Sequence, residues 1–191
     1  IAGDAGEGKV VIDDFAMSRE DGLLLPQSNT QVVAGWNGQY HGTEHDDIFF
    51  VDNASLLSGL THIDGHAGLD TLKLTGAGQV LDLQASAGRV LSSIEIIDLT
   101  GTGDNTLKLS LEDVLSQGAV DLFHESGHVQ MMIKGDVGDE VDLQGLIGRS
   151  DPGEWGVLGQ VTVAGTVYDV YQHSALGAEL LVQNGVEMHL G

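Results

Sequence analysis

The chain has 191 residues, of which 29 are Asp or Glu and only 7 are Lys or Arg, giving a formal net charge of −22. Nucleic-acid binding requires a basic surface that replaces phosphate counterions, and this composition excludes one. The sequence contains no cysteine, which excludes disulfides and thiolate chemistry, and no apolar run near the ~20 residues needed for direct insertion into a membrane. So large a negative charge weakens the compact state unless bound cations neutralise it.

Short segments of alternating apolar and polar residues, bounded by Gly, Asp or Asn, make up most of the chain. In order, they are residues 9–12, 70–74, 80–83, 94–99, 105–111, 161–171 and 179–190. This period of two is typical of β-strands. The pattern predicts one all-β domain over residues 1–191, with many short, largely antiparallel strands in a sandwich-like or irregular β-roll-like arrangement. Residues 1–35 are expected to form a flanking element of this domain.

Turn and capping residues add local detail to this prediction. Asn184-Gly185 and Ala164-Gly165 each separate two alternating runs, which predicts tight hairpins and an antiparallel C-terminal third. Ser110, followed by Asp113 and Gly118, predicts a short helix between an N-cap and a glycine stop. Residues 52–60 are expected to form a second short helix that begins after Asp52 or Asn53.

Acidic, glycine-rich corners precede several of the alternating runs. Thr-Leu-Lys-Leu occurs at residues 71–74 and 106–109, an offset of 106 − 71 = 35, and similar corners begin at Gly42 and Gly135. Ca²⁺ takes about six to eight oxygen ligands, which carboxylates and the carbonyls of sharp turns supply. The corners therefore predict calcium sites, with ligands from Asp46, Asp47, Asp64, Asp70, Asp104, Asn105, Asp136 and Asp139. The alternative is that these side chains only form turns by hydrogen bonding to the backbone.

A resemblance to known protein families supports the prediction of calcium sites. Residues 65–73, Gly-His-Ala-Gly-Leu-Asp-Thr-Leu-Lys, fit the nonapeptide G-G-x-G-x-D-x-U-x of calcium-binding β-rolls, with His66 at the second glycine. Residues 69–83, 94–115, 131–148 and 161–190 together resemble a module of giant bacterial RTX adhesins, and the resemblance extends over residues 40–191. It implies an extracellular location on the bacterial surface, a role in cell attachment and biofilm formation, and calcium-dependent binding of the free C-terminus of partner proteins.

The implied binding mode agrees with the chemistry of the corners. A Ca²⁺ ion with an unfilled coordination position can hold the terminal carboxylate of a peptide. We expect the pocket at residues 39–47 and 62–68, with contacts from Tyr40, His41, Glu44, His45 and His66. As an isolated domain the chain is expected to be a monomer.

Other functions remain open on the sequence alone. The domain could be a calcium-stiffened spacer or cap of an adhesin, or a carbohydrate-binding module. It could also be an enzyme in which His62, Asp64 and His66 hold zinc and an activated water. However, the sequence contains no nucleophile motif, phosphate-binding loop or hydride-cofactor fingerprint. The sequence therefore favours a binding module without catalytic activity.

Overall fold

The structure is a computed structural model that describes residues 28–58, 60–84, 90–101, 103–148 and 150–191, together with two short paired strands. These are β1 (Arg19–Glu20) and β2 (Leu23–Leu24), which pair antiparallel. The strand predicted at residues 9–12 lies outside the described residues. The described part is mostly β, with many short strands, as the alternating pattern predicts.

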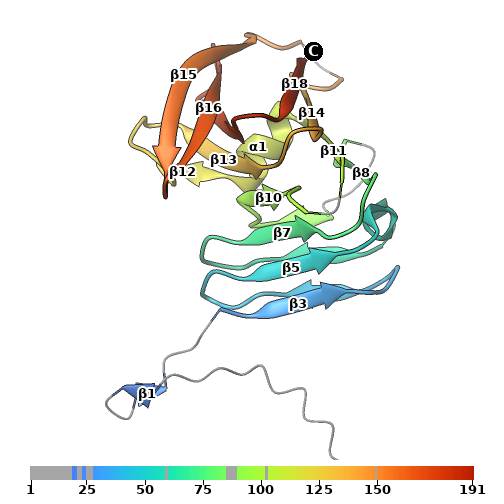
Figure 1. Ribbon diagram of the computed structural model, residues 1–191. Coiled ribbons are helices and arrows are strands. Elements are labelled where there is room, and N and C mark those ends of the chain that lie inside the picture. The colour runs from blue at the N-terminus through green and yellow to red at the C-terminus, as the bar shows by residue number, and fades with distance from the viewer. Residues whose placement is uncertain are drawn as a thin grey trace, which may run out of the picture.

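The chain winds in coils that stack on one another, and each coil returns to the same long sheet (Figure 1). Five successive rungs of this sheet pair in parallel with their neighbours. They are β3 (Thr30–Val33), β5 (Ile48–Val51), β7 (Thr71–Leu74), β10 (Ile96–Asp98) and β13 (Val129–Lys134). β17 (Ala178–Gln183) continues the sheet beside β13, also in parallel.

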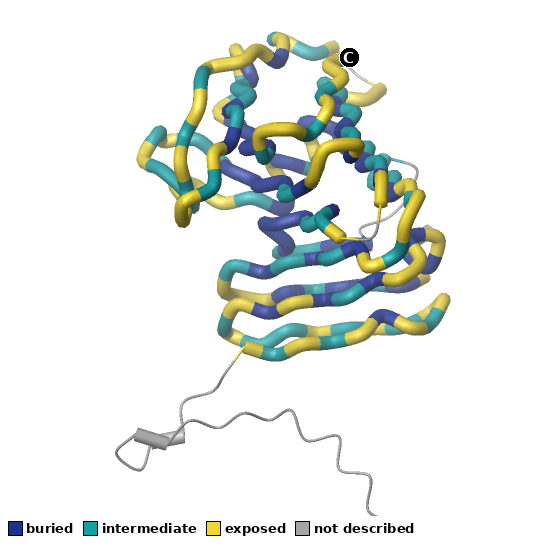
Figure 2. Tube along the Cα trace, in the orientation of Figure 1, coloured by how far each residue is buried: buried dark blue, intermediate teal, exposed yellow. Residues whose placement is uncertain are grey.

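Two smaller parallel sheets form other sides of the stack. One contains β4 (Gln39–His41), β6 (His62–Asp64) and β9 (Leu91–Ser92). The other contains β8 (Val80–Asp82), β11 (Thr106–Ser110), β14 (Glu140–Gln144) and β18 (Glu187–Leu190). Because alternate residues of each strand point inward, the middle of each coil is buried and the core follows the stack (Figure 2).

The long sheet is mixed and the two smaller sheets are parallel, which differs from the prediction of largely antiparallel strands. Antiparallel pairing is found in the C-terminal third, where β15 (Trp155–Val163) and β16 (Thr166–His173) form a hairpin and β16 pairs with β17. Ala164 and Gly165 form its turn, as predicted, and both have positive φ. β12 (Ala119–Val120) also pairs antiparallel with β13. The stacked coils pair in parallel because each coil runs in the same direction as the one before it.

The hairpin predicted at Asn184-Gly185 is wrong. β17 and β18, on either side of this turn, belong to different sheets. Both edges of β17 are already paired, with β13 and β16. The chain therefore crosses at Asn184-Gly185 to the edge of β14 and pairs there in parallel.

Both predicted helices are confirmed. The 3-10 helix η1 (Ala54–Ser58) follows Asn53, whose Oδ1 accepts the N–H of Ser55 at 3.0 Å. The helix α1 (Leu111–Gln117) follows Ser110, whose N–H donates to Asp113 Oδ2 at 2.7 Å. In the described part of the chain, no helix has the length and apolar character needed to cross a membrane.

The two Thr-Leu-Lys-Leu segments lie in different sheets. Residues 71–74 form β7 in the long sheet, whereas residues 106–109 belong to β11. They are not stacked on each other, so the 35-residue offset does not measure one coil. What they share is a polar side chain, Asp70 or Asn105, directly before the strand.

Candidate functional site

Buried acidic side chains stack at the corner that leads into the long sheet. Asp47, Asp70 and Glu95 directly precede β5, β7 and β10, and all three are buried. The N–H of Asp47 donates to Asp70 Oδ1 at 2.7 Å, and the N–H of Asp70 donates to Glu95 Oε2 at 2.9 Å. Each of these carboxylates therefore accepts the N–H of the equivalent residue in the preceding coil.

The corner before the sheet of β8, β11 and β14 is built in the same way. Asn105 Oδ1 accepts the N–H of Gln79 at 2.9 Å, and Asp139 Oδ1 accepts the N–H of Asn105 at 2.8 Å. The side-chain amide of Asn105 also donates to the Leu99 and Gly103 carbonyls. Four predicted calcium ligands, Asp47, Asp70, Asn105 and Asp139, thus satisfy backbone groups between coils.

The exposed predicted ligands lie beside these buried ones. Asp46 Oδ1 accepts the N–H of Leu69 at 2.8 Å at the first corner. At the second corner Asp104 lies against Gly138, where an added Cβ would be 2.3 Å from Asp104 Oδ1. Asp136 is exposed there, and its N–H donates to Asp139 Oδ2 at 2.7 Å. The structure therefore brings seven of the eight predicted ligands together in two groups, and places Asp64 apart from both on β6.

Burial and the charges of neighbouring carboxylates raise the pKa values of three corner carboxyl groups, those of Asp70, Glu95 and Asp139. Burial, then the charges of Glu95, Asp47 and Asp46, raise the pKa of Asp70 to about 7, although the N–H of Asp47 opposes the shift. Burial likewise raises the pKa of Glu95 and of Asp139. The one lysine–carboxylate ion pair between described residues is Lys73 with Asp98, at 2.9 Å, away from both corners.

One corner lacks a hydrogen bond that its equivalents make. After Gly42 and Gly135, the next residue donates its N–H to the second carboxylate oxygen of the corner acid, Thr43 to Asp47 and Asp136 to Asp139. After Gly65, the N–H of His66 instead donates to Asp64 Oδ1 at 3.1 Å. Asp70 Oδ2 is consequently buried without a hydrogen-bond partner.

Close packing confirms that these carboxylate oxygens occupy equivalent places. A Cβ added at Gly42 would lie 2.6 Å from Asp47 Oδ2, and one added at Gly65 would lie 2.3 Å from Asp70 Oδ2. Real Cβ atoms are not found so close to another heavy atom, so only glycine fits at either position. The two corners therefore share one backbone arrangement and differ in where the next N–H points.

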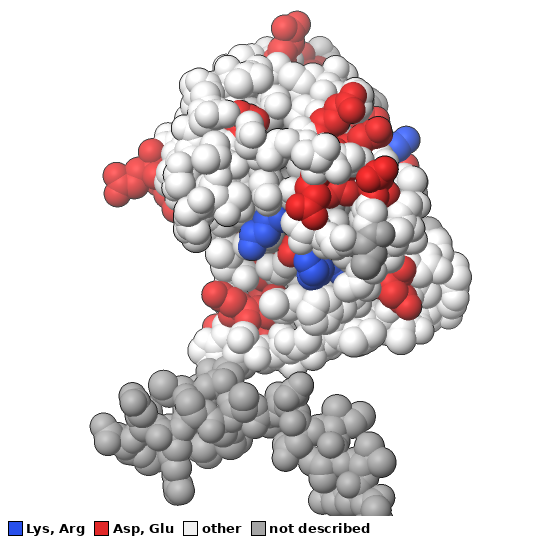
Figure 3. Space-filling view, viewed as in Figure 1, with Lys and Arg blue, Asp and Glu red and all other residues white. Residues whose placement is uncertain are grey.

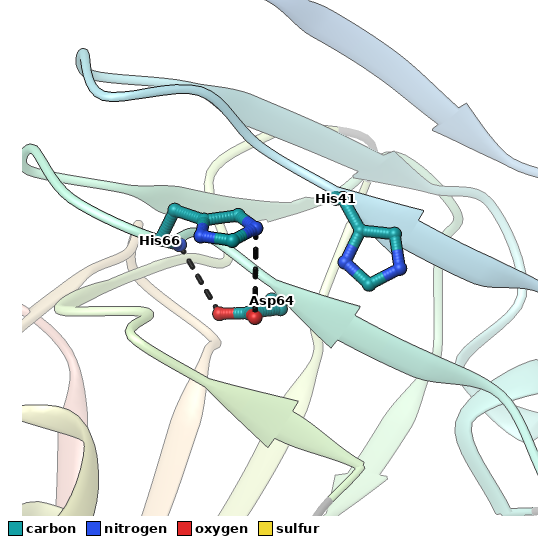
Figure 4. Close-up of side chains that lie close together, drawn as sticks. All are labelled: His41, Asp64 and His66. Atoms are coloured by element: carbon teal, nitrogen blue, oxygen red, sulfur yellow. Dashed lines mark hydrogen bonds and ion pairs between the residues drawn. The ribbon is translucent and has the colours of Figure 1, made fainter.

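His41, Asp64 and His66 form a cluster on the outer face of the sheet of β4, β6 and β9 (Figure 4). His41 lies directly opposite Asp64 in the parallel register, and His66 returns over Asp64 after the turn at Gly65. Burial raises the pKa of Asp64, but hydrogen bonds from the His66 N–H and the Ser92 hydroxyl, with the nearby histidines, lower it overall. The cluster thus presents an ionised carboxylate beside two imidazoles.

The other predicted ligand-binding residues have different surroundings. The Tyr40 hydroxyl oxygen accepts the N–H groups of Ala34 and Gly35, at 3.0 and 3.1 Å, and its ring packs against the core. Glu44 is exposed in the loop before β5, and the N–H of His45 donates to Thr43 Oγ1 at 3.2 Å. The structure brings His41 and His66 together and gives Tyr40 a packing role.

The alternative of an enzyme placed zinc on His62, Asp64 and His66, but the cluster in the structure contains His41 in place of His62. His62 and Asp64 are two residues apart on one strand, whereas His41 is the cross-strand neighbour of Asp64. Across a sheet, directly opposed residues are closer than residues two apart on one strand. The sequence singled out His41 as a ligand contact, but no signal in the residue types could have placed it opposite Asp64, because parallel register depends on coil length.

A buried carboxylate that the sequence did not point to lies at the other end of the stack. Glu179 on β17 accepts hydrogen bonds from Ser126 Oγ at 2.8 Å and Gln130 Nε2 at 3.0 Å. His124 Nε2 and His128 Nδ1 lie 3.1 and 3.3 Å from its two oxygens. These contacts hold the 121–128 loop against the long sheet.

A cavity of about 570 Å³ lies near the C-terminus, between the start of β15 and the end of β18. Trp155 and Asp151 line it. The Trp155 indole N–H donates to the Gln144 carbonyl at 3.1 Å, and Asp151 lies 3.0 Å from His173 Nε2. Both polar groups are therefore already engaged within the protein.

Similarity to known proteins adds no functional information. No family model, no curated protein and no solved structure matches this chain. Its function must therefore be inferred from the geometry and charge of the described residues.

Proposed function

We propose that the chain is a non-catalytic, calcium-dependent adhesion module on the bacterial cell surface, and that it binds the free C-terminus of a partner peptide or protein. One observation carries the proposal. Asp46, Asp47, Asp70 and Glu95 gather at one corner, where burial and mutual repulsion raise the pKa values of Asp70 and Glu95. A divalent cation would compensate this charge, which no described lysine or arginine pairs with.

The residues differ in how well they fit calcium. Both oxygens of Asp47 and of Asp139 accept backbone N–H groups, so these residues would contribute charge rather than coordination. Asp70 Oδ2 has no hydrogen-bond partner, and Asp46 beside it is exposed. Asp46 and Asp70 are therefore the residues that would hold Ca²⁺ at the first corner, and the exposed Asp104 and Asp136 would do so at the second.

Calcium would also supply the positive charge that a peptide carboxylate needs. The face seen in Figure 3 carries several groups of acidic side chains and few basic ones, and by itself it repels an anionic ligand. Calcium coordinates carboxylate oxygens and accepts ligands beyond those of the protein. Binding is expected to be modest, on the order of micromolar, because few terminal residues bury little area, while many copies on a surface add avidity.

A peptide library with free and amidated C-termini tests the proposal. Free C-termini should be retained in millimolar calcium and released by chelator, and amidated peptides should not be retained. Equal retention of both kinds of peptide would remove the carboxylate mechanism. Retention that is unchanged in chelator would remove the role of calcium.

Two matched variants test whether calcium and peptide bind at the first corner. Asp46→Asn combined with Asp70→Asn should weaken calcium binding and peptide retention together, because two carboxylates are lost at the first corner. Glu125→Gln removes one exposed carboxylate from the 121–128 loop that is not among the predicted calcium ligands, and it should leave both properties unchanged. If Glu125→Gln weakens peptide retention as much as the corner variant, general acidity rather than the corner is responsible.

The edge of β3 favours a second candidate function, a spacer in a longer stack. β3 ends the long sheet in the described part of the chain, and Val32 on it is 64% exposed. Another coil of the same kind could pair with this edge. The library separates the two functions, because a spacer that calcium stiffens would gain stability in calcium and retain no peptide.

A further inference from the structure

We propose that His41, Asp64 and His66 bind one Zn²⁺ ion on the outer face of the sheet of β4, β6 and β9. A ligand atom from each of the three side chains lies within 4.8 Å of the other two. These residues belong to neighbouring coils and are separate from the corner carboxylates proposed for calcium. The zinc site adjoins the first corner through Gly65 and His66, but it uses none of the carboxylates proposed for calcium, so a metal that prefers imidazole ligands can test it separately from peptide binding.

The fold aims the three side chains at one another. Ile63 is fully buried between His62 and Asp64, so Asp64 points outward from β6, as His41 does from β4. The turn at Gly65 brings His66 back over this face, with its Nε2 3.8 Å from Asp64 Oδ2. The two imidazole rings are 5.9 Å apart and inclined at 50° (Figure 4).

The backbone at this corner departs from its equivalents in a way that serves the cluster. His66 has φ 72°, in the region that residues other than glycine rarely adopt. Its N–H donates to Asp64 Oδ1 and so fixes the carboxylate. The same diversion leaves Asp70 Oδ2 buried without a partner, whereas Thr43 and Asp136 satisfy the equivalent oxygens elsewhere. At this corner the hydrogen bond to Asp70 Oδ2 is absent, and a hydrogen bond from the His66 N–H aligns Asp64 with His66 instead.

The kinds of ligand atom in the cluster indicate which metal ion it would bind. Two imidazole nitrogens and one carboxylate oxygen suit Zn²⁺, whereas Ca²⁺ prefers more ligands and oxygen alone. Tetrahedral zinc holds its ligand atoms roughly 3.3 Å apart, so the side chains must close slightly around the ion. His41 and His66 are exposed and Asp64 is partly exposed, which permits this rotation without disturbing the core. Three protein ligands leave one coordination position facing solvent.

Cobalt provides the test, because tetrahedral Co²⁺ absorbs visible light while Zn²⁺ does not. The protein, kept in excess calcium to fill any oxygen-only sites, is titrated with Co²⁺ and then with Zn²⁺. We expect visible absorption that saturates at one equivalent and disappears as Zn²⁺ displaces the cobalt. If the wild-type protein shows no such absorption, the zinc site is wrong.

Single variants identify the ligands. His41→Ala, His66→Ala and Asp64→Asn should each weaken Co²⁺ binding at least tenfold, with far-ultraviolet circular dichroism confirming that each variant is folded. Should His66→Ala fail to fold because of its unusual backbone, His41→Gln, on a regular strand, decides the question alone.

Two histidine variants are matched controls. His45→Ala changes a neighbouring loop histidine outside the cluster, and His189→Ala removes the imidazole of a second group of three described residues, with Glu140 and Glu187, whose ligand atoms also lie within 4.8 Å of one another. Both should bind Co²⁺ like wild type. Loss of absorption in His189→Ala, with binding retained in His41→Ala and His66→Ala, would overturn the assignment.

Discussion

The backbone N–H of Asp47 donates a 2.7 Å hydrogen bond to the carboxylate of Asp70, which occupies the same position one coil further along the chain. Glu95 repeats the contact with Asp70 in the next coil. A buried side chain therefore connects each of these coils to the next at the point where the long sheet begins. Since each unsatisfied buried N–H group costs free energy, these acids contribute to folding whether or not they bind a cation.

Substitutions at Asp70 separate its acceptor role from its charge. Asp70→Asn keeps an oxygen for the Asp47 N–H and removes the buried charge, as Asn105 does at the other corner. Asp70→Ala leaves that N–H without a partner, which costs about 1–3 kcal/mol. In chelator at pH 8, urea unfolding should show Asp70→Asn at least as stable as wild type and Asp70→Ala less stable. Equal destabilisation by both substitutions would contradict the acceptor role.

Stability should fall as pH rises from 5 to 8 when cations are absent. The pKa of Asp70 is raised by burial to about 7 from its ordinary value of 3.8, so the folded state binds this proton more tightly than the unfolded state. Its contribution is complete below the unfolded pKa and is lost as pH rises through 7. Glu95 and Asp139 shift in the same direction.

Urea unfolding in chelator across this pH range measures the slope, to which each unit of pKa shift can contribute about 1.4 kcal/mol. Asp70→Asn should flatten it. The pKa of Asp64 is lowered in the folded state, so Asp64 stabilises the protein at high pH. This contribution is lost only as pH falls through the folded pKa of Asp64, which lies below pH 5, so Asp64 does not affect the slope between pH 5 and 8. If the Asp70→Asn variant shows the same slope as the wild type, the pH dependence of stability comes from groups other than Asp70.

The sequence predicted part of the strands and their inward faces, because the period of two is a local property, but the predicted segments did not include β3, β4, β6 or β13. Phe49 and Leu72 each follow the corner acid by two residues, and both are completely buried. Leu107 bears the same relation to Asn105. The short helices were predictable for the same reason, since Asn53 and Ser110 cap them through local contacts.

Apart from the hairpin at Ala164-Gly165, pairing between strands could not be predicted, because the register of stacked coils depends on how many residues each coil contains. The identical segments 71–74 and 106–109 lie in different sheets, and Asn184-Gly185 connects two sheets instead of closing a hairpin. The position of His41 opposite Asp64 follows from that same register. The acidic corners were recognisable, but a carboxylate suits both a backbone N–H and a cation, so residue type alone does not assign its partner.

Calcium should stabilise the folded protein. An ion that binds only the folded state adds RT ln(1 + [L]/Kd), or about 2.7 kcal/mol at a concentration 100 times Kd. Thermal unfolding should therefore show a higher midpoint in millimolar calcium than in chelator, and Asp46→Asn combined with Asp70→Asn should reduce the difference. Magnesium, which demands stricter octahedral geometry, serves as the control ion. An identical midpoint in calcium and in chelator would remove calcium from the proposal.

Glu179 should anchor the 121–128 loop to the long sheet. Its carboxylate accepts hydrogen bonds from the Ser126 hydroxyl and the Gln130 side-chain amide, and it lies beside His124 and His128. Glu179→Ala leaves these partners facing a buried gap and should lower the free energy of unfolding by roughly 2–4 kcal/mol. Urea unfolding measures this loss, and faster proteolysis within the loop should accompany it. As a control, Glu125→Gln changes an exposed residue of the same loop and should leave both measurements at the wild-type values. If Glu179→Ala also leaves unfolding and proteolysis unchanged, Glu179 does not hold the loop.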